Sequence, residues 1–282
     1  MARTEGDGTR DPGRPSSGPD HPIDVPPILA ERHPDVPWRA FFRLYRDLPR
    51  AGPGTDACTR RALDLVGELG PGPSVYDLGC GPGRQTLVLA RELGSKVVAL
   101  DLVLHFLEEL RAAAEAAGLG ALVDPRLGDM AEPFAPPGSV DLIWAEGSIY
   151  LLGFEAGLRQ WRELLRPGGH VAVSEATWLA AAPPAEVRAY WHEQMPTLTD
   201  VAGNLARAQA AGYEVRGHFA LPREAWLEEY YSPLEARVER LADEASADEE
   251  LAAVLAETRR EIEVYRRWGD TYGYVFYVLR RT

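Results

Sequence analysis

The stretch Val75-Tyr76-Asp77-Leu78-Gly79-Cys80-Gly81-Pro82-Gly83 decides the fold of this chain. A short apolar run ends in an acidic residue and is followed by three glycines at alternate positions. Glycine accepts positive φ angles and has no Cβ, so a ligand can lie directly against such a backbone. A strand that leads through a glycine loop into a helix predicts a ligand site at the carboxyl edge of a parallel sheet.

On either side of this loop, short apolar runs alternate with helical stretches. The pattern predicts strands at 74–78, 97–100, 122–127, 140–145 and 170–174, and helices at about 84–93, 102–117 and 155–165. Strands that alternate with helices indicate an α/β fold, in which helices cover both faces of a mainly parallel sheet.

The flanking segments differ from this core in composition. The first 27 residues are rich in Gly, Pro and charged side chains, which predicts a disordered tail. Amphipathic helices are expected at 28–48, 184–194 and 199–211 and over 223–268, with strands at 213–220 and 272–279. We therefore expect five parts: a tail (1–27), an N-terminal helical lid (28–56), a ligand-binding core (57–178), a helical cap insert (179–212), and C-terminal strands of the core with a helical insert (213–282).

Composition limits the classes of partner. The formal net charge is −13 and no basic run occurs, so a nucleic acid is not an expected partner. Two cysteines are too few for a disulfide framework, which suggests a reducing compartment. The N-terminus lacks an apolar signal region and no stretch is long enough to span a membrane, so we expect a cytoplasmic protein without a membrane partner.

The carboxylates beside the loop distinguish two kinds of nucleotide site. A dinucleotide fingerprint, G-x-G-x-x-G, would need glycine where this chain has Arg84, and the carboxylate of Asp77 would repel a pyrophosphate. A nicotinamide-dependent dehydrogenase is therefore disfavoured. Asp101 ends the next strand, about 20 residues after the loop, where a carboxylate can bind ribose hydroxyls. Together these features predict a nucleoside site.

At this point the sequence resembles the class I S-adenosylmethionine (SAM)-dependent methyltransferases. In that family, the residues that match Asp77, Gly79 and Gly81 contact the methionine part of SAM, and the residue that matches Asp101 holds the ribose. The resemblance continues through Gly128-Asp129-Met130, where the family binds adenine. The implied cofactor contacts are Asp77, Gly79, Gly81, Asp101, Leu102, Gly128, Asp129, Met130 and, as a further candidate, Glu146.

The resemblance implies a Rossmann-like, parallel-dominated, seven-stranded sheet with an antiparallel last strand and a helical cap from inserts. Segments 144–150, 173–178 and 272–276 look closest to a bacterial subgroup of small-molecule methyltransferases. A small-molecule substrate, SAM as cofactor and S-adenosyl-L-homocysteine (SAH) as product follow from that resemblance.

Methyl transfer is an in-line displacement that needs a general base only when the acceptor carries a proton. Glu146 is the first candidate for an active-site carboxylate because it follows the fourth strand, although an ordinary strand-end carboxylate would look the same. His192 is a second candidate base. Tyr45, Tyr150 and Trp178 are candidates for the acceptor pocket, together with Tyr190 and Trp191, although aromatic side chains often form core instead. No residues show metal-ligand spacing, so no metal is expected.

Two other functions remain open at this stage. A SAM-binding enzyme could couple methylation to cyclisation or use the sulfonium differently, because the fold does not decide the chemistry. A non-catalytic SAM-binding module would lack a cavity that faces the methyl group. Exposed aromatic residues near the N-terminal helix could serve a lid or a homo-oligomer contact.

Overall fold

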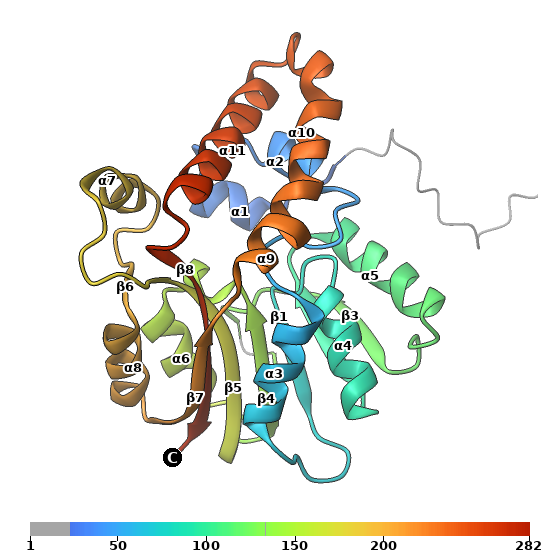
Figure 1. Ribbon diagram of the computed structural model, residues 1–282. Helices are drawn as coiled ribbons and strands as arrows, with labels where there is room; N and C mark the ends of the chain where they lie inside the picture. Colours follow the sequence, from blue (N-terminus) through green and yellow to red (C-terminus); the bar gives the residue numbers. More distant parts are fainter. Residues whose placement is uncertain (1–22, 133) are drawn as a thin grey trace, which may run out of the picture.

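The computed structural model describes residues 23–132 and 134–282, and a single twisted sheet forms its centre (Figure 1). Its strands are β1 (Val75–Leu78), β2 (Val97–Asp101), β3 (Val123–Leu127), β4 (Val140–Glu146), β5 (Leu165–Trp178), β6 (Thr199–Asp200), β7 (Tyr213–Ala220) and β8 (Tyr272–Arg281). Seven of them follow the order β3-β2-β1-β4-β5-β8-β7, and the two-residue β6 pairs with β5. Strands β1 to β5 are parallel, and β8 is antiparallel to both β5 and β7.

This topology confirms the predicted Rossmann-like class. The prediction of seven strands misses only β6, which is too short to leave a periodic pattern in the sequence. Most of the predicted disordered tail, residues 1–22, lies outside the described residues.

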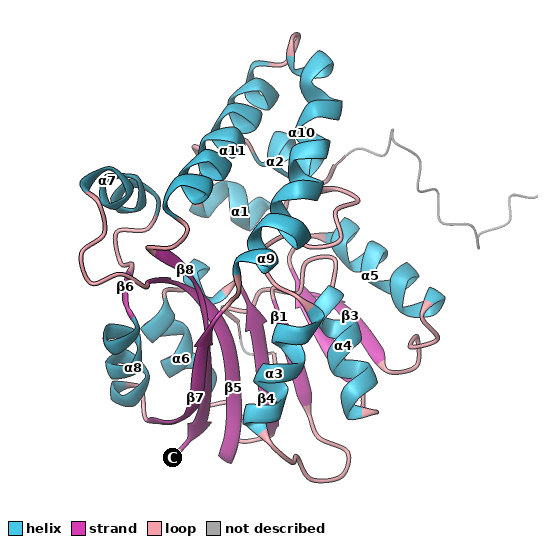
Figure 2. Ribbon diagram, in the orientation of Figure 1, coloured by secondary structure: helices cyan, strands magenta, loops and turns pink. Residues whose placement is uncertain are grey.

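Helices cover both faces of the sheet (Figure 2). One face carries α3 (Asp56–Val66), α4 (Arg84–Leu93) and α5 (Leu104–Ala116), and the other carries α6 (Phe154–Arg162) and α8 (Val201–Ala210). Successive side chains of a strand point to opposite faces. Ile143 and Trp144 on β4 therefore belong to different apolar clusters, and both are fully buried.

A helical cap lies over the carboxyl ends of the parallel strands (Figure 1). It contains α1 (Pro27–Arg32), α2 (Trp38–Tyr45), α7 (Ala185–Gln194), α9 (Arg223–Trp226), a π-helical turn η2 (Leu227–Tyr231), α10 (Ser232–Ala245) and α11 (Glu249–Trp268). The cap has an apolar cluster of its own, in which Phe42, Trp226 and Ile262 are almost completely buried. Elements from both ends of the chain therefore meet above the glycine loop.

Three segments differ from the sequence-based expectation for identifiable reasons. The predicted helix at 28–48 is two helices, because Pro34 and Pro37 interrupt the backbone hydrogen bonding after α1. The helical region at 223–268 breaks before Asp248, whose side chain caps α11 by accepting a hydrogen bond from the backbone N–H of Leu251 at 3.0 Å. Strand β5 begins before the predicted position and contains Pro167-Gly168-Gly169 as an irregularity in its pairing with β4.

Candidate functional site

The glycine loop has the backbone geometry that its sequence predicts. Gly79, Gly81 and Gly83 have φ angles of 64°, 54° and 77°. A Cβ at Gly79 would lie 2.6 Å from Cβ of Ser148, so the loop has no room for a side chain there. The Ser148 hydroxyl donates a hydrogen bond to the carbonyl oxygen of Leu78 at 2.6 Å, which joins the end of β1 to the segment after β4.

Asp101 holds this loop from the end of the neighbouring strand. Its Oδ2 accepts a hydrogen bond from the Gly81 N–H at 2.8 Å, and its Oδ1 accepts one from the Val103 N–H at 2.9 Å. Burial raises the pKa of this carboxyl, and these backbone donors oppose the rise. Each carboxylate oxygen has a further lone pair, so the position remains suitable for binding ribose hydroxyls.

Asp77 is fully buried beneath the loop. Its Oδ2 accepts a hydrogen bond from the Thr86 hydroxyl at 2.5 Å, whereas Oδ1 has no hydrogen-bond partner in the described part of the chain. Burial raises the pKa of this carboxyl to about 8. Because a buried acceptor without a donor is costly, a cationic amino group such as that of SAM would fit this oxygen.

The residues expected around adenine lie after β3. The Gly128 N–H donates to the Asp101 carbonyl at 2.9 Å, and a Cβ at Gly128 would meet the Leu100 side chain at 2.7 Å. Asp129 forms an ion pair with Arg32 at 2.7 Å, which ties α1 of the cap to this loop. Met130, the next residue expected to contact the cofactor, is buried. Leu102, another expected cofactor contact, follows β2, is half-buried and packs against the cap.

Glu146 lies at the end of β4, and both of its carboxylate oxygens already have partners. Oε1 accepts hydrogen bonds from the Thr59 hydroxyl at 2.7 Å and from the Trp144 indole at 3.0 Å. Oε2 pairs with Arg50 at 3.3 Å, and the Arg50 side chain is only 4% exposed. The ion pair anchors the segment before α3 to the end of β4. Ala51 in that segment lies beside the glycine loop, since a Cβ at Gly81 would lie 3.5 Å from the Ala51 Cβ. Sequence reasoning identified Glu146 but missed Arg50.

The other predicted catalytic and pocket residues separate into two groups. Tyr45, Tyr150 and Trp178 lie where the cap meets the sheet edge: Tyr45 shares a 2.8 Å hydrogen bond with Tyr230, and Trp178 packs edge-on against Tyr272. Tyr150 lies on the short helix η1 (Ile149–Leu151) and is 45% exposed. In contrast, His192 is exposed in the last turn of α7.

His192 therefore remains only a prediction as a base. Within residues 23–132 and 134–282, no hydrogen bond joins its imidazole to Glu146 or to the aromatic candidates.

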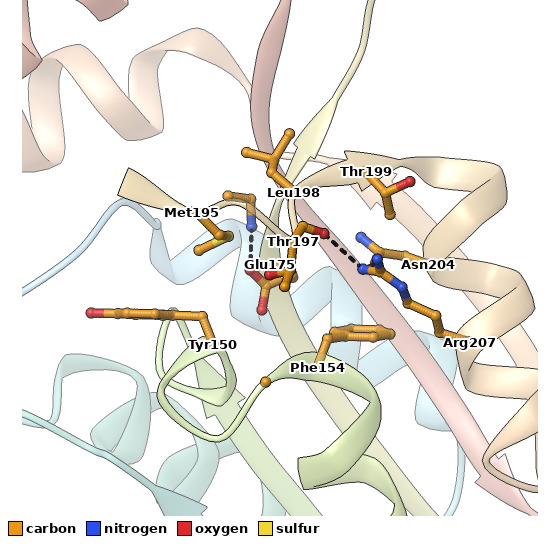
Figure 3. Close-up of a pocket in the computed structure, with 11 residues that line it drawn as sticks. Tyr150, Phe154, Glu175, Met195, Thr197, Leu198, Thr199, Asn204 and Arg207 are labelled. Carbon is orange, nitrogen blue, oxygen red and sulfur yellow. Dashed lines mark hydrogen bonds between the residues drawn. The ribbon is translucent and has the colours of Figure 1, made fainter. Parts of the chain in front are cut away.

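Sequence reasoning did not single out Glu175, which is buried near the end of β5. Its Oε1 accepts a hydrogen bond from the Ala176 N–H at 3.1 Å, and Oε2 has no partner among the described residues. Burial raises its pKa to about 8. The carboxylate lines a small pocket of about 10 Å³. Figure 3 shows it among the lining side chains, with the Tyr150 ring to its left and the Phe154 ring below. Its position at a strand end, like that of Asp77, was the available sequence signal.

A second carboxylate that the sequence did not reveal is Glu261 on α11. It is half-buried, and its Oε1 accepts a hydrogen bond from the Tyr231 hydroxyl at 2.9 Å. Its charge raises the pKa of seven tyrosine phenols: Tyr45, Tyr150, Tyr190, Tyr230, Tyr231, Tyr272 and Tyr274. In the six of these that are buried or half-buried, all except Tyr150, burial is the largest cause of the raised pKa and the Glu261 charge adds to it. These tyrosines come from α2, η1, α7, η2 and β8.

A larger hollow of about 520 Å³ lies at the opposite edge of the sheet, lined by residues 67–73 and Ser95. These residues precede β1 and β2, whereas open α/β sheets bind ligands at the carboxyl ends of their strands. Across residues 23–132 and 134–282, no three His, Cys, Asp or Glu side chains gather as a metal site. In the same ranges, no helix has the length and apolar character needed to cross a membrane.

Comparison with known proteins identifies the core. Residues 75–169 match a family model described as a methyltransferase domain. Nocamycin O-methyltransferase of Saccharothrix syringae is 35% identical over 132 residues, which are 46% of this chain and 45% of that protein. Phosphoethanolamine N-methyltransferase 1 of Arabidopsis thaliana is 29% identical over 146 residues, 51% of this chain and 29% of that protein. The chain thus spans less than half the length of these curated relatives.

Solved structures show the same fold. A SAM-dependent methyltransferase from Geobacter sulfurreducens, in complex with SAH, has a TM-score of 0.75 at 22% identity and covers 88% of this chain and 99% of its own. The [4+2]-cyclase SpnF has a TM-score of 0.62 at 22% identity, covering 82% of this chain and 83% of its own. The matched family model, the curated relatives and this fold together show that the chain contains a class I SAM-dependent methyltransferase domain.

Proposed function

We propose that this protein is a cytoplasmic enzyme that transfers a methyl group from SAM to a small-molecule acceptor. The observation that carries the proposal is the convergence of Asp77, the glycine loop and Asp101 on one sheet edge beneath a cap. The relatives named as O- and N-methyltransferases and the net charge of −13 also favour a small acceptor over a nucleic acid.

In this proposal the loop residues hold the cofactor. The unpaired Oδ1 of Asp77 accepts a hydrogen bond from the amino group, and Asp101 accepts hydrogen bonds from the ribose while it fixes the loop through Gly81. Gly79 and Gly81 supply the positive φ angles of the loop, and Gly79 lets it pack directly against Ser148. When bound, SAM supplies an electrophilic methyl group.

The cap supplies the acceptor side of the site. Tyr45, Tyr150 and Trp178 stay proposed as its lining, and helices packed over the sheet edge would exclude water from the reacting atoms. For an acceptor that must lose a proton, Oε2 of Glu175 is free to receive it, whereas both oxygens of Glu146 are occupied. A carboxyl pKa of about 8 is close to the working pH, which suits a general base.

Glu146 is better suited to a positioning role, because it links Arg50 and Thr59 across the loop. The segment 28–56 would then act as the lid. The ion pairs Arg50–Glu146 and Arg32–Asp129 hold this segment against the core.

A transfer assay with SAM labelled in its methyl group tests the proposal. The protein is incubated with panels of hydroxyl, amine, thiol and carbon-acid acceptors, and with nucleic acid and protein. Label in a small molecule, lost in Asp101→Asn, supports the proposal. Label only in a macromolecule contradicts it, and SAM binding without any transfer favours a SAM-binding protein with different chemistry. The fold similarity to a [4+2]-cyclase is the observation that keeps this second function open.

A further inference from the structure

The carboxylate of Asp129 is held from two sides. Its Oδ1 accepts a hydrogen bond from the Ala131 N–H at 2.8 Å, which closes a turn within the loop after β3. Its Oδ2 pairs with Arg32 at 2.7 Å. The Asp129 side chain is 12% exposed and that of Arg32 is 38% exposed, so the carboxylate is the inner partner and the guanidinium the outer one. The pair thus connects a helix of the cap to the loop that is expected to hold adenine.

The loop is anchored to the core independently of this ion pair. The Trp161 indole, fully buried on α6, donates a hydrogen bond to the Met130 carbonyl at 3.1 Å. On the other side of Asp129, the Gly128 N–H donates one to the end of β2 at 2.9 Å. The loop should therefore keep its place when Arg32 is replaced.

The helix α1 depends more strongly on its neighbours. It has six residues, of which only Leu29 is buried, in the same apolar cluster as Val103 after β2. The Trp38 indole fastens α1 to α2, because it donates to the carbonyls of Leu29 and His33 at 3.1 and 3.2 Å. A helix this short is not stable by itself in water. The order of α1 should therefore respond to the strength of its ion pair with the loop.

We propose that Arg32 is a positioning residue for the cofactor that acts through Asp129, so that bound adenine and α1 hold each other in place. Each carboxylate oxygen of Asp129 has a further lone pair, which can accept a hydrogen bond from the adenine amino group while the ion pair remains. Bound adenine would exclude water from this carboxylate, and a charge pair is stronger where water is excluded. The inference rests on the proposed cofactor site, because Asp129 belongs to it.

The coupling has to be reciprocal, because two groups that bind the same carboxylate and favour the same arrangement stabilise each other equally. SAH should order α1, and α1 should retain SAH. Both effects can be measured without a known methyl acceptor.

Hydrogen–deuterium exchange of the full-length protein, with and without saturating SAH, measures the first effect. We expect SAH to slow exchange in the glycine loop, residues 79–84, and in α1. In Arg32→Gln, SAH should still protect the loop. The added protection of α1, about two- to fivefold for an ion pair of this exposure, should be lost.

The dissociation rate of SAH, measured by stopped flow, gives the second effect. Arg32→Gln should release SAH about two- to fivefold faster. Arg43→Gln is the matched control, because Arg43 is 36% exposed but pairs with Glu244 and Asp248 within the cap. It should change neither the rate nor the protection of α1. The double variant Arg32→Gln/Asp129→Asn should be no faster than Asp129→Asn, since both changes break one interaction.

Protection of α1 that is unchanged in Arg32→Gln, release of SAH at the parent rate, or additive effects of the two substitutions would each overturn the inference. So would a parent protein in which SAH protects the loop but not α1. If SAH protects neither segment of the parent protein, the proposed cofactor site itself is contradicted.

Discussion

At the scale of single residues, Asp101 fixes the glycine loop through Gly81, and in the proposed function its carboxylate also binds the ribose. Asp101→Asn should weaken SAH binding by about ten- to a hundredfold, the range for a hydrogen bond to a charged group. The matched control is Asp124→Asn on the neighbouring strand β3, whose carboxylate pairs with the exposed Arg126. Calorimetric titration measures both, and an equal loss in the control would remove Asp101 from the site.

Gly79 tests whether the loop needs space as well as backbone freedom. Gly79→Ala should abolish SAH binding, because its φ of 64° is strained for alanine and its Cβ would overlap Ser148. Gly94→Ala carries the same strain, with a φ of 56°, but its Cβ would have no neighbour within 4 Å. The control should lose about 1 kcal/mol of stability and still bind SAH. Similar binding by both variants would contradict this account of the loop.

Sequence reasoning found the residues that follow strands and missed those that depend on tertiary packing. Asp77 and Asp101 could be located because a buried strand and a glycine loop precede or follow them in the chain. Glu261 could not, because it stands in a helix with many exposed charges, and only the packing of tyrosines from five other elements makes it distinct. Arg50 was missed for the same reason, since its partners Glu146 and Asp56 come from separate elements.

At the scale of elements, the Arg50–Glu146 pair holds the N-terminal segment against the end of β4. Glu146→Gln should lower the free energy of unfolding by about 1.5–3 kcal/mol, because the buried guanidinium loses a charged partner. Glu155→Gln, in an exposed pair with Arg159, should cost less than about 1 kcal/mol. Chemical denaturation measures both values. Unchanged stability combined with lost turnover would instead make Glu146 the catalytic base.

The order of elements was predictable because strands and helices differ in apolar period, and the core at 75–178 follows that order closely. The cap was less predictable. Prolines at 34 and 37 divide the first expected helix, and a π-helical turn lies just before Pro233 in the last helical region. Proline is also tolerated in the first turn of an ordinary helix, so Pro233 alone does not predict a π-helical turn. The pairing of the short β6 with β5 depends on where the long connection after Trp178 returns, which no local pattern specifies.

At the scale of the whole molecule, several buried carboxyls give the protein an unusual pH dependence. Burial raises the pKa to about 8 in Glu175 and to about 7 in Glu261, so the folded protein holds protons that the unfolded chain releases near pH 4.5. Stability should therefore be greatest below about pH 4.5 and fall as the pH rises, by at most about 1.4 kcal/mol per pH unit for each carboxyl, until it levels off near pH 7 for Glu261 and near pH 8 for Glu175.

Glu175→Gln should make this fall shallower, because it removes one of the carboxyls that must ionise in the folded state. The exposed Glu250→Gln on α11 is the control and should retain the parent slope. Denaturation midpoints across this pH range measure the slope, and a stability that rises with pH in the parent protein would contradict the burial of these groups as described.

The claim that the sheet edge binds SAM can be tested without knowing the acceptor. We would titrate the full-length protein calorimetrically with SAM, SAH and NADH, each with and without a chelator. The account predicts that SAM and SAH bind, that the chelator changes neither affinity, and that NADH does not bind. Binding of NADH alone would contradict it, because the loop would then hold a dinucleotide despite Asp77 and Arg84.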